Sequence, residues 1–190
     1  MASLIPLFIA PPIAYVGLSM LWMLTKTVDK VDAQVKYDSL TGVLNRSHFL
    51  DSVRGRRADG VLLIVDADNF KSINDTRGHA AGDEALRVLG HTLERAAGPK
   101  AFVGRLGGEE FGVFLPGSSL QDGTSTAVAL CHAVAGVNMI VDGRPLSMTI
   151  SIGGTLHQSS TIIGHSLKVA DDRLYKAKQT GKNRAVLDGP

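Results

Sequence analysis

The pattern of apolar and polar positions separates an apolar N-terminal segment from a longer region of mixed pattern. Residues 4–24 read LIPLFIAPPIAYVGLSMLWML and contain no charged side chain. This length is sufficient for a helix to cross the roughly 30 Å hydrocarbon core of a bilayer. Pro6, Pro11 and Pro12 would kink the first half. Residues 1–25 are therefore expected either to span a membrane or only to anchor the chain at its surface.

The residues that follow indicate an orientation and a linker. Lys26, Lys30 and Lys36 follow the apolar segment, and no basic residue precedes it. The positive-inside rule therefore predicts a chain at the inner (cytoplasmic) membrane, with its C-terminal portion in the cytoplasm. Within residues 26–36, valines at spacings of three and four residues predict an amphipathic linker helix. Its narrow apolar stripe can pack on a domain or on a second copy of the chain.

Beyond the linker, the pattern predicts alternating helices and strands over residues 37–187. Residues 61–65 form a continuous apolar run, VLLIV, which is typical of a central strand covered on both faces. Apolar residues on either side of a glycine-containing turn predict a β-hairpin over 101–115. Helices are expected over 47–55 with Ser47 as N-cap, 82–97, 125–139 and 166–179, and a further strand over 146–152. This order predicts an α/β (α+β) fold with a central sheet flanked by helices.

Composition narrows the classes of function. The chain has 190 residues, of which 44% are hydrophobic, enough for one folded domain with an appended segment. A formal net charge of +2 and the lack of a long basic run argue against a nucleic-acid partner. Cys131 is the only cysteine, which excludes an intramolecular disulfide and fits a reducing compartment. Its apolar surroundings predict a small buried residue on a helix.

Candidate chemistry gathers at one strand end and one hairpin turn. Asp66 directly follows the central apolar run, and a carboxylate at the end of a buried strand is costly unless it is hydrated, paired or bound to a cation. The turn carries Gly107 and Gly108, which let a backbone lie against a ligand, followed by Glu109 and Glu110. Mg²⁺ prefers carboxylate and carbonyl oxygens together with water and substrate phosphates. The residue types predict a metal-phosphate site, with a solvated acidic turn as the alternative.

Six motifs in a fixed order carry a resemblance to a known family. They are DxLTGxxNRxxF (38–49), DxDxFKxxND (66–75), GHxxGD (78–83), GGEEF (107–111), SIG (151–153) and ADxxLYxAKxxGKN (170–183). Together they resemble the GGDEF-domain diguanylate cyclases over about residues 37–184. The resemblance implies a fold related to the palm of polymerases and nucleotidyl cyclases, with a mostly antiparallel sheet. It also implies an enzyme that condenses two GTP molecules into cyclic di-GMP and two pyrophosphates across a two-fold homodimer.

The resemblance further implies a metal centre and catalytic residues at matching positions. Mg²⁺, for which Mn²⁺ could substitute, would be held by Asp66, the backbone carbonyl of Ala67, Glu109 and Glu110. One of the two glutamates would also help to remove the proton of the attacking 3′-hydroxyl. Lys71 would act beside them on the triphosphate.

Substrate recognition is implied for a second set of residues. The guanine base of GTP would be read by Asn74 and Asp83, whose amide and carboxylate suit its donor and acceptor edge. His79 lies between them and either contacts the substrate or packs the loop. The remaining substrate-binding positions are Gly107 and Gly108 at the turn, and Lys178 and Lys182 near the triphosphate.

The chain departs from the family pattern at two positions. Many family members carry an Arg-x-x-Asp product-inhibition site five residues before the glycines, where residues 98–101 of this chain read GPKA. Feedback inhibition at that position is therefore expected to be absent. Lys182 stands where arginine is usual, which keeps the charge but loses bidentate phosphate geometry. The alternative to the enzyme is a catalytically silent module that binds GTP or cyclic di-GMP and acts through protein contacts.

Overall fold

The computed structural model describes residues 15–16, 18–20, 22–23, 36–55, 59–141 and 143–187. The chain divides into two compact units, Met1–Lys36 and Tyr37–Pro190. Within the described ranges, no helix is both long enough and apolar enough to cross a membrane. Most of the expected membrane segment 4–24 and of the expected linker helix 26–36 lies outside these ranges, and Lys36, which lies inside them, is not helical.

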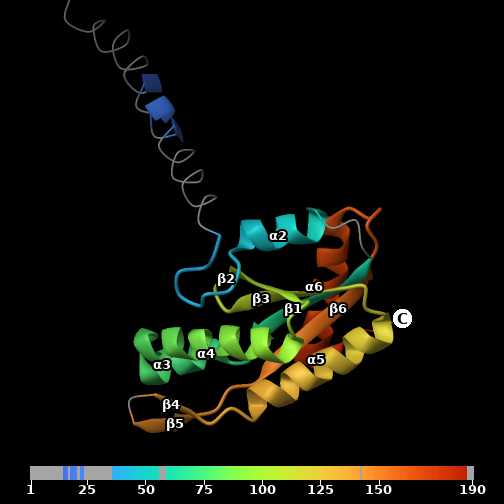
Figure 1. Cartoon of the computed structure of the whole chain (residues 1–190). Coiled ribbons are helices and arrows are strands. Elements are labelled where there is room, and N and C mark those ends of the chain that lie inside the picture. Colours follow the sequence, from blue (N-terminus) through green and yellow to red (C-terminus); the bar gives the residue numbers. More distant parts are fainter. Residues whose placement is uncertain are drawn as a thin grey trace, which may run out of the picture. The chain divides into compact units, whose positions relative to one another are not determined.

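The second unit is built on a five-stranded sheet (Figure 1). Its strands are β1 (Gly60–Ala67), β2 (Phe102–Gly107), β3 (Glu110–Pro116), β6 (Ile150–His157) and β7 (Ala185–Val186). They follow the order β2-β3-β1-β6-β7, and all neighbours are antiparallel except β6 and β7. A separate hairpin is formed by β4 (Met139–Val141) and β5 (Arg144–Leu146). The expected central, mostly antiparallel sheet is confirmed.

Helices cover both faces of this sheet (Figure 1). One face packs against α4 (His79–Ala97) and α5 (Leu120–Ala135), and α3 (Phe70–Arg77) packs against α4. The other face packs against α2 (Arg46–Gly55) and α6 (Ile163–Gln179). The expected arrangement of a sheet flanked by helices is therefore confirmed, with layers on two sides.

The central strand β1 explains the continuous apolar run in the sequence. All eight of its residues are buried. Successive side chains of a strand point to opposite faces, so Val61 and Val65 join the core under α4 and α5, whereas Leu62 and Ile64 join the core under α2 and α6. Because both faces are covered, polar residues have no solvent-facing position in the strand before its end.

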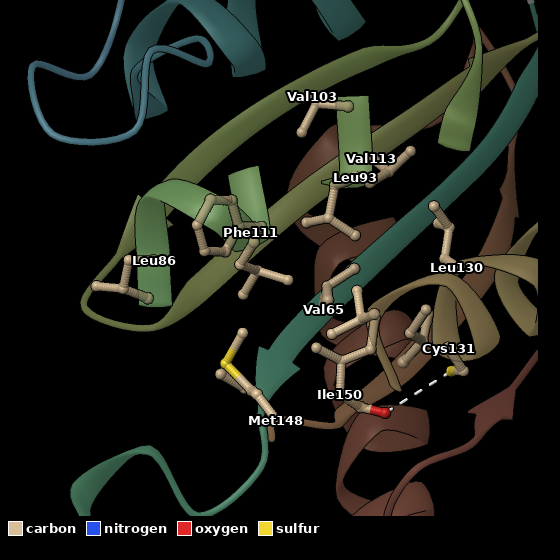
Figure 2. Close-up of a cluster of buried hydrophobic side chains, with 14 of the residues drawn as sticks. Val65, Leu86, Leu93, Val103, Phe111, Val113, Leu130, Cys131, Met148 and Ile150 are labelled. Atoms are coloured by element: carbon tan, nitrogen blue, oxygen red, sulfur yellow. Dashed lines mark hydrogen bonds between the residues drawn. The ribbon is translucent and has the colours of Figure 1, made fainter. Parts of the chain in front are cut away.

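The larger of the two cores lies between the sheet, α4 and α5. Figure 2 shows Phe111 from β3, Leu93 from α4 and Leu130 from α5 gathered around the sheet. Cys131 lies in the same core with its Sγ 3.7 Å from the carbonyl oxygen of Ile150. Burial raises the pKa of this thiol to about 12, so it is not a reactive thiolate. The expectation of a small buried residue on a helix is confirmed.

Several expected element boundaries are wrong, for local reasons. The first helix begins at Arg46, and its capping side chain is Asn45, whose Oδ1 accepts from the backbone N–H of His48 at 2.9 Å, not Ser47. Helix α5 begins well before the expected residue 125, because Ser119 and Asp122 form a reciprocal capping box. The strand expected over 146–152 is β6, which begins only at Ile150 and continues to His157 through two glycines.

Candidate active site

The end of β1 and the start of β3 bring the expected metal ligands together. Asp66 and Glu110 are directly opposite each other in the antiparallel register, so their side chains leave the same face of the sheet about 5 Å apart at Cβ. The backbone N–H of Ala67 donates to the carbonyl oxygen of Glu109 at 3.3 Å. The peptide of Ala67 is thereby held beside the turn that carries both glutamates.

The charges at this position repel one another. Burial raises the pKa of Asp66, and the nearby Glu109 and Asp68 add to that effect, although Lys178 opposes it. Burial also raises the pKa of Glu110, and Asp66 and Asp171 act in the same direction. A cation placed between Asp66 and Glu110 would remove this repulsion. The opposed positions of Asp66 and Glu110 and the raised pKa of each carboxyl thus both indicate that a cation between them would be stabilised.

The donor set fits a hard cation only if backbone or substrate oxygens complete it. Over the described ranges, no group of three or more His, Cys, Asp or Glu side chains is gathered closely enough to hold a metal ion. Carboxylates of Asp66 and the two glutamates with the Ala67 carbonyl are all oxygen donors, as Mg²⁺ prefers, and Mg²⁺ commonly takes only one or two carboxylates with substrate phosphates. The residues present therefore fit Mg²⁺ bound together with a nucleotide.

Helix α6 supplies the cation that Asp66 contacts in the protein itself. Lys178 Nζ lies 2.9 Å from Asp66 Oδ2. The helix reaches this position because it crosses Gly153 without an intervening side chain: a Cβ at Gly153 would lie 2.0 Å from the Ala170 carbonyl oxygen and 2.1 Å from the Leu174 nitrogen. Lys178 follows Leu174 by one turn. The close packing of α6 on Gly153, the glycine of the SIG motif, therefore determines how near Lys178 comes to Asp66.

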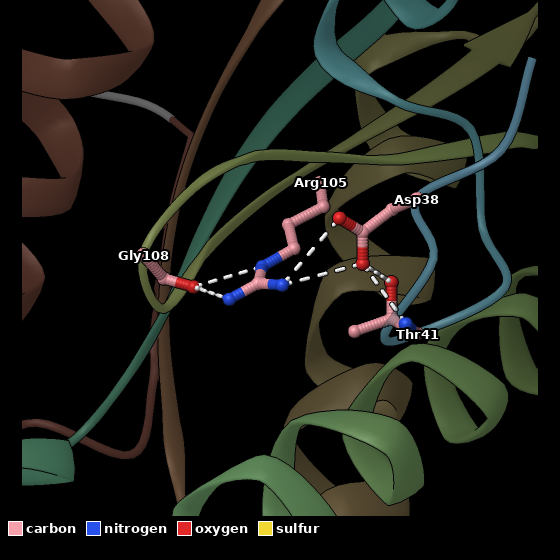
Figure 3. A network of polar contacts seen from close by, with 4 residues as sticks. All are labelled: Asp38, Thr41, Arg105 and Gly108. Atoms are coloured by element: carbon pink, nitrogen blue, oxygen red, sulfur yellow. Dashed lines mark hydrogen bonds and ion pairs between the residues drawn. The ribbon is translucent and has the colours of Figure 1, made fainter. Parts of the chain in front are cut away.

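The glycine turn is held by Arg105, an arginine on β2. Gly108 has φ of 51°, in the left-handed region that favours glycine. Its carbonyl oxygen accepts from Arg105 Nε at 2.9 Å and from Arg105 Nη2 at 2.7 Å. Figure 3 shows this guanidinium between Gly108 and Asp38. Both hydrogen bonds fix the peptide that immediately precedes Glu109.

Asp38 connects the start of the domain to this turn. Arg105 Nη1 lies 3.3 Å from Asp38 Oδ1, and the same oxygen accepts from the Thr41 backbone N–H at 2.9 Å and its hydroxyl at 2.6 Å. Burial alone would raise the pKa of Asp38, but the hydrogen bonds from Thr41 and the charge of Arg105 outweigh it and lower the pKa. Sequence reasoning missed the contact between the first motif and the glycine turn, because the two are separated by 67 residues.

The expected guanine-reading residues lie together on α3 and α4, away from these ion pairs. Asn74 packs against the backbone of Gly82, where a Cβ would lie 2.0 Å from Asn74 Oδ1. Asp83 follows Gly82 and is exposed, and so is His79 at the first position of α4. Lys71 is exposed near the start of α3. Within the part of the chain that the structure describes, no hydrogen bond or ion pair connects these side chains to the carboxylates at the β1 end.

Asp68 is a further residue whose role the sequence did not reveal. Asp68 follows Asp66 by two residues, yet it is 5% exposed and its carboxylate accepts three hydrogen bonds from the protein. Lys182, an expected phosphate contact, lies on the same side and donates from Nζ to Asn69 Oδ1. The residue identities alone carry no signal for this arrangement.

Comparison with known proteins decides the family. The model described as "Diguanylate cyclase, GGDEF domain" matches residues 35–184. The chain belongs to the GGDEF diguanylate cyclase family. It is 37% identical over 165 residues to the diguanylate cyclase DgcM of Escherichia coli (strain K12), covering 83% of this chain and 40% of DgcM. The chain thus spans about two fifths of the length of that GGDEF relative.

Solved structures of GGDEF proteins share the fold. The diguanylate cyclase SiaD from Pseudomonas aeruginosa, in complex with its activator SiaC, superposes with a TM-score of 0.78 at 28% identity, over 96% of this chain and 73% of SiaD. The active GGEEF domain of a diguanylate cyclase from Vibrio cholerae gives a TM-score of 0.64 at 27% identity, over 75% of this chain and 90% of that domain. The family resemblance and the fold inferred from the motifs are confirmed.

Proposed function

We propose that this GGDEF chain is a diguanylate cyclase, which condenses two GTP molecules into cyclic di-GMP and releases two pyrophosphates. The observation that carries the proposal is the opposition of Asp66 and Glu110 across β1 and β3, beside the Ala67–Glu109 backbone contact. This is an all-oxygen donor set at the end of a central strand, where Lys178 only partly offsets the repulsion among the carboxylates. The similarity to an active GGEEF domain supports the proposal, because residues 107–111 of this chain have the same sequence.

The proposed chemistry is attack of the 3′-hydroxyl of one GTP on the α-phosphorus of the other, with pyrophosphate as leaving group. Bound Mg²⁺ supplies charge neutralisation at the attacking and leaving oxygens. Asp66, the Ala67 carbonyl, Glu109 and Glu110 would hold it. Glu109 or Glu110 would accept the proton of the hydroxyl, since both lie at the turn facing the substrate. Most of the catalytic effect is then positioning and electrostatic stabilisation.

Two groups of residues are proposed to recognise GTP, one at its guanine base and one at its triphosphate. Asn74 and Asp83 would bind the guanine edge, and His79 would lie beside it at the start of α4. Lys71, Lys178 and Lys182 would receive the triphosphate, with Lys178 leaving Asp66 for a phosphate oxygen when metal and nucleotide bind. The Lys178–Asp66 contact of 2.9 Å supports this role, because the ammonium lies beside a proposed metal ligand.

Assembly and location follow from the same chemistry. Each chain provides one half-site for one GTP, so the proposed reaction requires two chains related by a two-fold axis. Residues 26–36 would bring two copies together through their apolar stripe, and residues 4–24 would tether the pair to the inner membrane. No nucleic-acid partner is proposed, given the low net charge.

The second candidate is a catalytically silent module that binds GTP or cyclic di-GMP. The presence of Asp66, both turn glycines and both glutamates favours the enzyme, because loss of these groups is what would silence the site. The lack of an Arg-x-x-Asp sequence at residues 98–101 also disfavours a receptor for the product.

The deciding experiment incubates the full chain in detergent micelles with GTP and Mg²⁺ and identifies nucleotides by chromatography and mass spectrometry. Cyclic di-GMP from the parent and none from a Glu109→Ala, Glu110→Ala double variant is the expected result. Glu94→Ala serves as a control, since Glu94 is an exposed carboxylate on α4 outside the site. A folded, GTP-binding parent that stays silent after artificial dimerisation would refute the enzyme and favour the binding module.

A further inference from the structure

Backbone strain in this protein is concentrated at one place. Among the residues that the structure describes, the non-glycine residues with positive φ are Asn69 (55°), Lys182 (60°) and Asn183 (45°). Residues with a Cβ adopt this left-handed region only at a free-energy cost, and the surrounding structure must hold them there. Asn69 lies between β1 and α3, whereas the other two lie between α6 and β7. Two loops more than a hundred residues apart in sequence therefore share one strained junction.

The carboxylate of Asp68 lies at the centre of this junction. Its Oδ2 accepts from the backbone N–H of Asn183 at 3.0 Å and from the Thr149 hydroxyl at 2.7 Å. Its Oδ1 accepts from the Ser151 hydroxyl at 2.6 Å. The backbone N–H of Asp68 itself donates to the Thr149 carbonyl oxygen at 2.9 Å. One buried carboxylate thus ties the end of β1, the start of β6 and the loop after α6 to one another.

These contacts distinguish Asp68 from the neighbouring Asp66. Protein donors already take three of the about four lone-pair directions that the two oxygens of Asp68 offer. Among the described residues, the side chain that pairs with the Asp66 carboxylate is Lys178, whose ammonium a bound cation can replace. The two residues of the Asp-x-Asp motif therefore differ in function, although their side chains are identical and only one residue separates them.

The loop held by Asp68 carries Lys182, one of the lysines of the proposed triphosphate site. Lys182 Nζ donates to Asn69 Oδ1, and its backbone N–H donates to the Ala177 carbonyl oxygen at 3.0 Å. The side chain of Lys182 therefore reaches from the loop after α6 to the β1–α3 loop. Its partner there, Asn69, precedes Lys71 by two residues. The hydrogen bond from the Asn183 N–H to Asp68 fixes the backbone immediately after Lys182 in the left-handed conformation, which residues with a Cβ rarely adopt.

We propose that Asp68 is a positioning residue, which holds the 181–184 loop against the β1–α3 loop and so forms the cradle that receives the triphosphate of GTP. The inference rests on the proposed function, since it deepens the assignment of that site. It requires that Asp68 act through the Asn183 backbone and Lys182, and that it bind no metal ion itself.

The test compares Asp68→Asn with the parent and with Asp59→Asn in the full chain. Asp59 precedes the other end of β1, and its Oδ1 accepts from the Ser159 backbone N–H at 2.8 Å, so the control neutralises the carboxylate of a similar loop anchor at the opposite end of the strand. Three quantities are measured: affinity for an α,β-methylene GTP analogue, affinity for GMP, and hydrogen exchange of the Asn183 amide. For Asp68→Asn we expect about tenfold weaker analogue binding, the scale of losing one hydrogen bond to a charged group. GMP affinity should change less than twofold, and the Asn183 amide should exchange faster.

The outcomes separate the alternatives. Analogue affinity within twofold of the parent, or an equal loss in Asp59→Asn, overturns the proposal. So does Mn²⁺ binding, followed by electron paramagnetic resonance at saturating analogue, that falls in Asp68→Asn as far as in Asp66→Asn, because Asp68 would then be a ligand. If Asp68→Asn does not fold, Thr149→Val takes its place, because it removes one donor to the Asp68 carboxylate while keeping the shape of the side chain. Thr149→Val should weaken analogue binding at least twofold. An unchanged affinity overturns the proposal.

The same measurements keep this inference apart from the enzymatic activity. A parent that binds the analogue but makes no cyclic di-GMP refutes the cyclase, and the affinity of Asp68→Asn then still decides the role of Asp68. A parent that binds no analogue overturns the triphosphate cradle itself.

Discussion

A close approach between helix α6 and strand β6 makes Gly153→Ala an informative substitution. The added Cβ would lie 2.0 Å from the Ala170 carbonyl oxygen, about 1.4 Å short of the 3.4 Å at which ordinary contact begins. The obstructing atoms belong to the backbone of α6, so no side-chain rotation relieves the overlap. Gly153 is not among the positive-φ glycines, so alanine is compatible with its backbone conformation and the clash is the only perturbation.

The expected effect has two parts. Overpacking typically costs about 1–3 kcal/mol, and a clash with backbone belongs at the upper end, so we expect about 3 kcal/mol of destabilisation. For a chain of this size that corresponds to a fall in Tm of about 6–12 °C. If α6 instead moves out by about 1.4 Å, the Lys178–Asp66 distance of 2.9 Å lengthens to about 4.3 Å, beyond the roughly 4 Å limit of an ion pair.

Urea denaturation followed by circular dichroism at 222 nm measures the free energy of unfolding, in the same detergent for every variant. Intrinsic tryptophan fluorescence is unsuitable, because Trp22 is the only tryptophan and lies outside the unit Tyr37–Pro190. Gly164→Ala is the matched control: it lies on the same helix, and nothing lies within 4 Å of its added Cβ. It should be neutral or stabilising by up to about 1 kcal/mol. A Gly153→Ala variant within about 0.5 kcal/mol of the parent would refute the packing argument.

Three further predictions address the turn, the pH response and product inhibition. Arg105→Lys keeps the charge but loses the forked donor to the turn, so kcat should fall about tenfold. The control Arg46→Lys alters a single hydrogen bond, from the Arg46 guanidinium to a carbonyl oxygen of the same strand β2, and should change kcat less than threefold. Equal effects of the two substitutions would contradict the argument. Burial lowers the pKa of His157, so its neutral form is favoured in the folded state and stability should fall as pH drops below about 6.5. Urea midpoints at pH 7.5 and 5.5 measure this fall, and a His157→Gln variant that falls as steeply as the parent would exclude His157 as its cause. Because residues 98–101 lack the Arg-x-x-Asp pair, initial rates should be unchanged by added cyclic di-GMP at that site, and strong product inhibition in a rate assay would contradict this reading.

The sequence determined the elements whose signal is local or periodic. The apolar run over 61–65 identified β1 as a strand covered on both faces, because a strand leaves no solvent-facing position when helices pack on each side. The glycine turn between apolar runs identified the β2–β3 hairpin. The ordered motifs identified the family, since each motif position is an identity that can be read without coordinates.

Element boundaries depended on contacts that a periodic pattern does not contain. Capping by Asn45 and by Ser119 is a competition among several polar residues near each helix start, and only the folded backbone selects the one whose oxygen reaches an N–H. Strand β6 begins at Ile150 because its ladder partner is the end of β1 at Ala67. Such pairing is set by the neighbouring strand and not by residue preference.

Only the tertiary structure decided which contacts each of the two aspartates of the Asp-x-Asp motif makes. Asp66 and Asp68 are indistinguishable in the motif, yet β1 presents Asp66 to Lys178 and to Glu110, whereas three protein donors enclose Asp68. Hydrogen bonds to a carboxylate depend on atoms brought together from residues more than eighty positions away. Spacing along the chain specifies which residues are available, and only folding specifies which donors reach them.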